Sequence, residues 1–110
     1  MLSVFLLLPS IARAQFTYTT AAGKITITGY TGPGGAVAIP DTLSGLPVNG
    51  IASYAFYNIS NLNGVTFGTN VTSIGDSAFA SCTSLTNVAL PKNVTSIGAG
   101  VFEDSDSLTA

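Results

Sequence analysis

The sequence predicts a repeat solenoid that is mostly β, with short helical turns and a β-hairpin at its N-terminal end. Three observations predict this class. The run VTSIG occurs at 71–75 and again at 94–98, so it recurs after 23 residues. Five apolar columns keep their register, without a gap, through three successive segments around these runs. Two stretches of alternating apolar and polar residues precede the repeats. A period of 20–50 residues is typical of stacked repeat units.

The repeat has three segments, and its apolar columns are expected to form ladders of like side chains inside the stack. A unit of this size cannot bury its apolar side alone, so neighbouring units must bury each other's faces. The segments are 48–70, 71–93 and the partial segment 94–110. The columns include Ile51, Ile74 and Ile97; Ala55, Ala78 and Val101; Phe56, Phe79 and Phe102; and Leu62, Leu85 and Leu108.

Each repeat is expected to contain a strand followed by a returning piece. Leu85, Val88 and Leu90 are predicted to point inward along the strand, which Pro91 ends because proline cannot donate to a β-ladder. VTSIG is predicted to be a second short extended piece that forms the corner of the coil.

The segment after VTSIG is expected to turn the chain and fill its interior. Gly75 or Gly98 would turn the chain, and DSAF at 76–79 is interpreted as a short helical turn that Asp76 caps. Phe79 is predicted to lie inside the coil.

The chain before the repeats is predicted to contain a hairpin and a half repeat, together covering 15–47. The alternating residues of FTYTTAAGKITITGY at 16–30 indicate two strands around a tight turn. TGPGG at 31–35 is interpreted as a connector, and GAVAIP at 35–40 resembles the strand NVALP at 87–91. Because solenoids need a cap at each open end, this hairpin is expected to be the N-terminal cap.

The first residues, 1–14, are predicted to be a secretion signal that is cleaved before Gln15. The segment has a short apolar run and ends in ARA, which places small residues at the −1 and −3 positions. The run is far shorter than the ~20 residues of a transmembrane helix. A positively charged start is missing, so the signal is truncated or begins at a miscalled Met; the competing interpretation is a buried N-terminal helix. The mature protein is expected to be secreted or at the cell surface.

The pattern L-x-x-V-x-[IL]-P-x-x-V-T-x-I-G-x-x-A-F-x-x-C-x-x-L resembles the BspA-like class of bacterial leucine-rich repeats, and the likeness covers 16–110. The segment at 16–48 also resembles the one that precedes such repeats in secreted bacterial members. The resemblance implies a solenoid of the leucine-rich-repeat type in an exported or cell-surface protein for adhesion or protein binding, without catalytic residues. Repeat one departs from the pattern at Ala52 and Ile59, and repeat three at Ser105.

The charge content excludes several classes of function. Charged residues make up 7% of the chain, the formal net charge is −2, and the cations are Arg13, Lys24 and Lys92. Nucleic acids and anionic membranes need clustered cations, so neither is an expected partner. The chain has no His, which excludes imidazole metal sites and Ser-His-Asp or Cys-His catalysis. We therefore expect no enzyme activity, no cofactor and no metal.

Two remaining chemical groups have structural interpretations. Glu103, Asp104 and Asp106 are too few ligands for a Ca²⁺ site, which wants about 6–8 oxygens, so a solvated face is expected. Cys82 is the only cysteine and lies in a column with Ile59 and Ser105. It is therefore expected to pack as a small buried residue.

The candidate binding surface has two parts. Side chains between the inward columns of the strands should face outward, and these are Asn63, Thr66, Thr86 and Asn87. Tyr54 and Tyr57 fall near the helical turn, where a binding role and partial packing on the coil edge are both open. A protein or a surface glycan is the expected partner. The alternatives are a purely structural spacer from a larger repeat protein and, with less support, an accessory domain of an extracellular hydrolase.

The C-terminal end of the array is expected to be incomplete. The third repeat stops before the residues that would match Val88 and Leu90. An open strand edge is a template for pairing with another chain. The sequence therefore predicts that further coils follow in the full gene, and that this chain self-associates through its C-terminal end.

Overall fold

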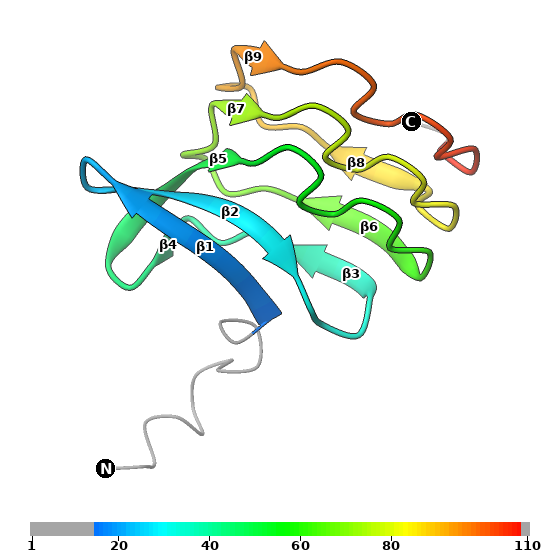
Figure 1. Cartoon of the computed structure of the whole chain (residues 1–110), viewed down its shortest axis with the longest axis horizontal. Coiled ribbons are helices and arrows are strands. Elements are labelled where there is room, and N and C mark those ends of the chain that lie inside the picture. Colours follow the sequence, from blue (N-terminus) through cyan, green and yellow to red (C-terminus); the bar gives the residue numbers. More distant parts are fainter. Residues whose placement is uncertain (1–14, 109–110) are drawn as a thin grey trace, which may run out of the picture.

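A stack of β-coils forms the part of the chain that this computed structural model describes, residues 15–108 (Figure 1). The secretion signal predicted at 1–14 lies outside the described residues. The nine strands of the described part are β1 (Phe16–Ala21), β2 (Lys24–Tyr30), β3 (Gly35–Ala38), β4 (Thr42–Leu43), β5 (Leu46–Ile51), β6 (Leu62–Thr66), β7 (Ser73–Ile74), β8 (Asn87–Ala89) and β9 (Ser96–Ile97).

Two sheets line opposite sides of the stack; coils one and two contribute one strand to each sheet, and coil three contributes β9 to one of them. One sheet has the order β1-β2-β5-β7-β9, with β4 paired to β5, and the other has the order β3-β6-β8. Val65 pairs with Val88 in one sheet, while Ile51 pairs with Ile74, and Ile74 with Ile97, in the other. Each of these parallel pairs is offset by one repeat, so the predicted solenoid and its register are confirmed. We call 48–70, 71–93 and 94–108 coils one, two and three.

The predicted hairpin forms at the N-terminal end of the stack. Strands β1 and β2 pair antiparallel, and Ala22 and Gly23 between them have φ angles of 53° and 75°. Two left-handed residues define the turn whose twist suits a two-residue hairpin loop. Strand β2 then pairs parallel with β5, so the hairpin extends the sheet of coil one. That it acts as a cap stays a prediction. GAVAIP supplies β3, which pairs parallel with β6. This is the pairing expected if GAVAIP is the strand of an initial half repeat.

A column of stacked aromatic rings runs along the core. The Phe56 and Phe79 rings are 4.9 Å apart with an interplanar angle of 15°, and Phe79 and Phe102 are 5.9 Å apart at 18°. Tyr30 extends the column from β2, with its ring 5.4 Å from that of Phe56. Phe67 meets Phe79 edge-on at 5.9 Å. Phe56 and Phe79 are fully buried, which confirms the predicted interior column.

Polar side chains tie each coil to the one before it, and they explain why VTSIG recurs. Thr72 Oγ1 donates to the Asn49 carbonyl at 3.2 Å, and Thr95 Oγ1 donates to the Thr72 carbonyl at 3.4 Å. The backbone N–H groups of both threonines donate to the same two carbonyls. Ile74 of the first VTSIG is buried in the core. The first copy of the motif therefore supplies two core residues, Val71 and Ile74, and both copies supply hydrogen bonds to the preceding coil.

The predicted helical turns are wrong. Over 76–81 the chain makes consecutive β-turns, in which Ala80 N donates to Ser77 O at 3.2 Å, and Ser77 and Ser81 have φ angles of 54° and 59°. An α-helix needs a negative φ throughout. The N–H of Phe79 instead donates to the carbonyl of Val101 at 2.9 Å, in the next coil. Hydrogen bonds between coils thus replace those that a helix would make within itself.

Asp76 does not cap a helix, whereas Gly75 does begin a turn, since Ala78 N donates to Gly75 O at 3.3 Å. Asp76 Oδ1 accepts a hydrogen bond from Ala99 N, 2.9 Å away in coil three, so it links coils rather than caps a helix. Neither Gly75 nor Gly98 has a left-handed φ. A Cβ at Gly75 would lie 2.5 Å from the Ser53 nitrogen. Glycine is needed here because the coils approach closely, and not because the turn imposes a left-handed φ.

The side chain of Leu90, predicted to point inward, is 45% exposed, and it lines an apolar hollow with Val88, Phe102 and Leu108. Val88 is partly buried and Leu85 is fully buried, as predicted. Ile97 of coil three is likewise 49% exposed. Among residues 15–108 no strand pairs with the outer edge of β8 or of β9, so both side chains lie at the end of the described stack. Within the same range, no helix has the length and apolar character needed to cross a membrane.

Candidate functional site

The sheet β3-β6-β8 presents an open depression to solvent. Asn63, Thr66, Thr86 and Asn87 are brought together here, and all four are exposed, as the sequence predicts. The depression has a volume of about 240 Å³. Its lining consists of Ala36, Val37, Ala38, Asn63, Gly64, Val65, Thr66, Thr86 and Asn87, none of which is charged.

Small residues create this depression. Ala36 and Ala38 of β3 lie beside Gly64 and Thr66 of β6 in the parallel register. A Cβ at Gly64 would be 3.5 Å from Asn87 Oδ1. Because glycine has no Cβ, no side chain at position 64 covers the Asn87 amide. Sequence reasoning missed the two alanines. The likeness of GAVAIP to NVALP, which places Ala36 and Ala38 in the register of the outward residues, could have found them.

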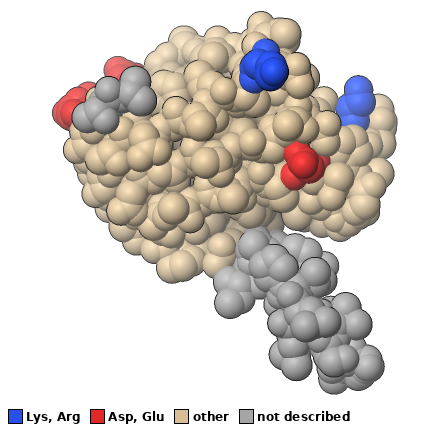
Figure 2. All heavy atoms as spheres, turned by 180° about the vertical axis from the view of Figure 1, so that it is seen from behind, with Lys and Arg blue, Asp and Glu red and all other residues tan. Residues whose placement is uncertain are grey.

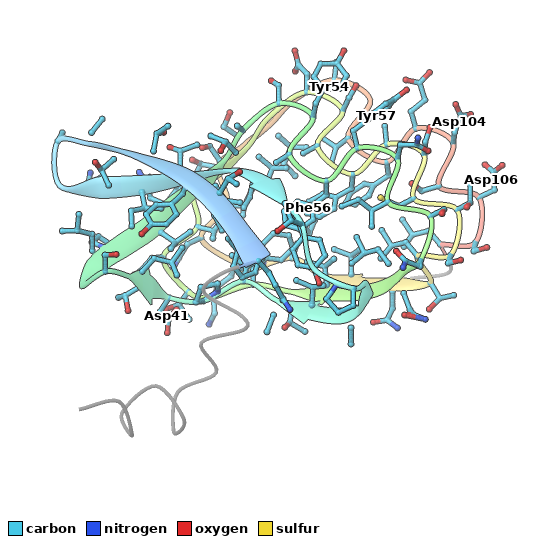
Figure 3. The ribbon with its side chains drawn as sticks, turned by 60° about the horizontal axis from the view of Figure 1, so that its bottom comes forward. Asp41, Tyr54, Phe56, Tyr57, Asp104 and Asp106 are labelled. Atoms are coloured by element: carbon cyan, nitrogen blue, oxygen red, sulfur yellow. The ribbon has the colours of Figure 1, made fainter. Side chains whose placement is uncertain are left out.

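Tyr54 and Tyr57 lie elsewhere, on the side of the stack formed by the turns (Figure 3). Their side chains are 60% and 49% exposed, and their rings meet edge-on with centroids 5.4 Å apart. The six predicted binding residues therefore form two separate surfaces and not one continuous strip. Packing on the coil edge, the other role left open for these tyrosines, buries only part of each side chain.

Cys82 is buried, as its column predicts, and it makes a structural hydrogen bond. Its Sγ donates to the Phe56 carbonyl at 3.1 Å. One repeat later, Ser105 Oγ donates to the Phe79 carbonyl at 2.8 Å. Burial raises the pKa of the Cys82 thiol, so the neutral form is favoured. This pattern identifies the column as a hydrogen-bonding position of the repeat rather than as a reactive site.

The acidic residues of coil three are exposed and do not form a metal site. Asp104 and Asp106 project from the turns of coil three, while Asp41 lies on the opposite side of the stack (Figure 3). Within 15–108, no group of three His, Cys, Asp or Glu residues could hold a metal ion. Seen from behind, most of the molecular surface carries no charged side chain (Figure 2). This face is therefore predominantly uncharged (Figure 2).

The stacked coils, the hydrogen-bonded Cys and Ser column and the strand-lined face define a leucine-rich-repeat protein. Residues 37–110 match the family model of the BspA type leucine rich repeat region. This chain belongs to that family.

Solved structures of bacterial proteins have the same fold. The chain is similar to a leucine rich repeat protein from T. pallidum, with 36% identity, a TM-score of 0.84, and coverage of 86% of this chain and 45% of that one. A leucine rich cell surface protein from Faecalibacterium prausnitzii A2-165 has 33% identity and a TM-score of 0.77 over 86% of this chain and 28% of that one. A leucine-rich repeat protein from Bacteroides capillosus has 31% identity and a TM-score of 0.81 over 86% and 75%.

The chain spans less than half the length of the T. pallidum and F. prausnitzii proteins. A comparison with curated proteins gives no match.

Proposed function

We propose that this chain is an exported, non-enzymatic module that binds a protein partner at the cell surface. The observation that carries the proposal is the open, uncharged depression across β3, β6 and β8. We call its exposed residues Ala36, Ala38, Asn63, Thr66, Thr86 and Asn87 the strand face. They lie on three hydrogen-bonded parallel strands, except Thr86, which directly precedes β8.

The chemistry of the strand face suits an uncharged polypeptide segment. The amides of Asn63 and Asn87 can both donate and accept hydrogen bonds, so they can pair with a peptide backbone. Ala36, Ala38 and Gly64 allow a partner to approach the sheet closely. Because the lining is neutral, little of the affinity should come from charge, and binding should depend weakly on salt.

The strand face can be tested with the full chain as bait. Surface proteins from the native organism would be captured, and the captured protein then purified and titrated against the parent chain. We expect Asn87→Arg and Thr66→Arg to weaken binding at least about tenfold, because each places a charge in a neutral interface. Lys92→Glu is the matched control, since it changes a surface charge outside the strand face. A purified partner that binds both strand-face variants as tightly as the parent would contradict the proposal, and no partner at all would favour a structural spacer.

Export has its own measurement. The full chain with a C-terminal tag would be expressed in a bacterial host, and the cell surface and medium separated from the cytoplasm. We expect tagged protein outside the cytoplasm that begins at Gln15, because small residues precede this position at −1 and −3. Protein that stays in the cytoplasm with residues 1–14 attached would contradict export. Adhesion is the further step that we propose, through partners carried on neighbouring cells.

A further inference from the structure

Tyr54 occupies a backbone position where a large side chain is costly. Its φ angle is 62°. The residues one and two repeats later, Ser77 and Gly100, have φ angles of 54° and 63°, so the coil geometry imposes a left-handed residue at this position. Bulky residues rarely adopt this conformation, whereas Gly, Asn and Asp tolerate it. The fold explains the φ angle, but it does not explain why coil one has tyrosine there.

Packing accounts for only part of each tyrosine ring. Tyr54 is 60% exposed and Tyr57 is 49% exposed, and the two rings meet edge-on. The next coil has Ser77 and Ala80 in the same two columns. Because these side chains are much smaller, the tyrosine pair stands above the surface of coil two. It therefore borders a step above Ser77, which is half-buried, while Ala80 in the Tyr57 column is already covered at 3% exposed.

A carboxylate lies on the other side of this step. A Cβ at Gly100 would be 3.0 Å from Glu103 Oε1 and 3.6 Å from Ser77 Oγ. The Glu103 carboxylate is thus next to Gly100. Gly100 lies in the same repeat column as Tyr54. Successive strands in a stack are about 4.8 Å apart, which puts the backbone of Gly100 roughly 10 Å from that of Tyr54. We call Tyr54, Tyr57, Ser77, Gly100 and Glu103 the tyrosine ledge.

We propose that the tyrosine ledge binds an arginine side chain from a basic segment of a partner protein. A guanidinium stacks on an aromatic face and also donates two parallel hydrogen bonds to a carboxylate, which a compact ammonium cannot do as well. Its flat head would lie against the Tyr54 and Tyr57 rings and reach Glu103 across Ser77. This inference goes beyond the proposed function, because the tyrosine ledge and the strand face share no residue.

The charge around the ledge complements a basic segment. Asp104 and Asp106 project from the same side of the stack as the tyrosines (Figure 3). The two lysines of the described residues are elsewhere, since Lys24 begins β2 and Lys92 lies between β8 and β9. A cation at the ledge would therefore meet attraction from several carboxylates, while neither lysine of residues 15–108 belongs to the ledge.

The test uses the full chain and a synthetic peptide with arginine at every third residue and glycine and serine between. Binding would be measured by fluorescence anisotropy at low salt. A peptide with citrulline in place of arginine keeps the shape without the charge, and a lysine peptide keeps the charge without the planar head. We expect the arginine peptide to bind most tightly, the lysine peptide less tightly and the citrulline peptide not at all. Added salt should weaken binding, because exposed charges are screened.

Matched variants locate the site. We expect Tyr54→Asn, Tyr57→Ala and Glu103→Gln each to lower affinity by about two- to fivefold, the range of one exposed cation–π or charged contact. Asparagine accepts the left-handed backbone, so Tyr54→Asn should fold. Asp41→Asn removes one negative charge from the opposite side, and Asn87→Arg alters the strand face. Asn87→Arg should leave the arginine peptide bound, so loss of the proposed function and loss of this site are distinguishable.

The proposal is overturned by equal binding of the arginine and citrulline peptides. It is also overturned if Asp41→Asn weakens binding as much as Glu103→Gln does, because the effect would then be net charge alone. Binding of a neutral oligosaccharide that depends on Tyr54 and Tyr57, without binding of the arginine peptide, would assign the ledge to glycans instead.

Discussion

Replacing Phe79 with alanine should cost as much stability as any single truncation in the aromatic column, matched only by Phe56, which is equally buried and also has three ring partners. Phe79 is fully buried, stacks on Phe56 at 4.9 Å and on Phe102 at 5.9 Å, and meets Phe67 edge-on. Truncating a buried Phe to Ala costs about 3–5 kcal/mol, because apolar transfer is lost and a cavity remains. Aromatic pairs add about 0.5–1.5 kcal/mol beyond the buried area. Since Phe79 has three ring partners, we expect about 4–5 kcal/mol.

The assay is urea denaturation followed by circular dichroism, with the urea dependence compared between variants. Phe102→Ala is the matched control, because Phe102 is only partly buried, and its loss should be about 1–2 kcal/mol. Small domains are stable by about 5–15 kcal/mol, so Phe79→Ala could leave too little folded protein to titrate. Phe79→Leu, with an expected loss of about 1–2 kcal/mol, keeps the order of the series measurable. A loss below about 1 kcal/mol for Phe79→Ala would refute the buried column.

Three further predictions follow from particular contacts. Tyr54→Asn should leave the free energy of unfolding unchanged or raise it by up to about 1 kcal/mol in thermal or urea denaturation, because it relieves a left-handed tyrosine; a clear loss would mean that the ring packs. The free energy of unfolding should fall as pH rises above 9.0, the ordinary thiol pKa, because burial raises the pKa of Cys82 and the unfolded chain releases the proton first; Cys82→Ser should remove this fall. Gly75→Ala should destabilise by about 1–3 kcal/mol, since its Cβ would lie 2.5 Å from Ser53 N, whereas Gly64→Ala should cost less than 1 kcal/mol; equal costs would contradict the close approach.

The repeat period, the core columns and the hairpin could be predicted because each depends on a local pattern. Phe79 repeats at Phe56 and Phe102, and stacking turns this repetition directly into a ladder. The corners could not be predicted in the same way. DSAF has the composition of a capped helical turn, yet the Phe79 N–H bonds to a carbonyl one repeat away. Local propensity was overridden by hydrogen bonds between coils, which a single repeat does not display.

The candidate site was predictable only in part, because some of its contacts also form between coils or across turns. The outward positions of Asn63 and Asn87 follow from strand alternation, and the structure places both on the strand face. The register of a half repeat adds Ala36 and Ala38, which a reading of complete repeats omits. The position of Glu103 beside Gly100 depends on a side-chain conformation across a turn, and no spacing in the sequence shows it.

The stacking of coils in a register of one repeat is the central claim, and a disulfide tests it directly. Thr66 and Ala89 are partners on neighbouring parallel strands, and both side chains are exposed. Partner Cα atoms on adjacent strands are about 4.8 Å apart, within the 4.4–6.8 Å range of disulfides. With Cys82 changed to Ser, the pair Thr66→Cys and Ala89→Cys should oxidise rapidly within one chain, as measured by thiol titration and mass spectrometry. The pair Thr66→Cys and Asn87→Cys, offset by two residues, should oxidise slowly; equal rates, or faster closure of the offset pair, would contradict the register.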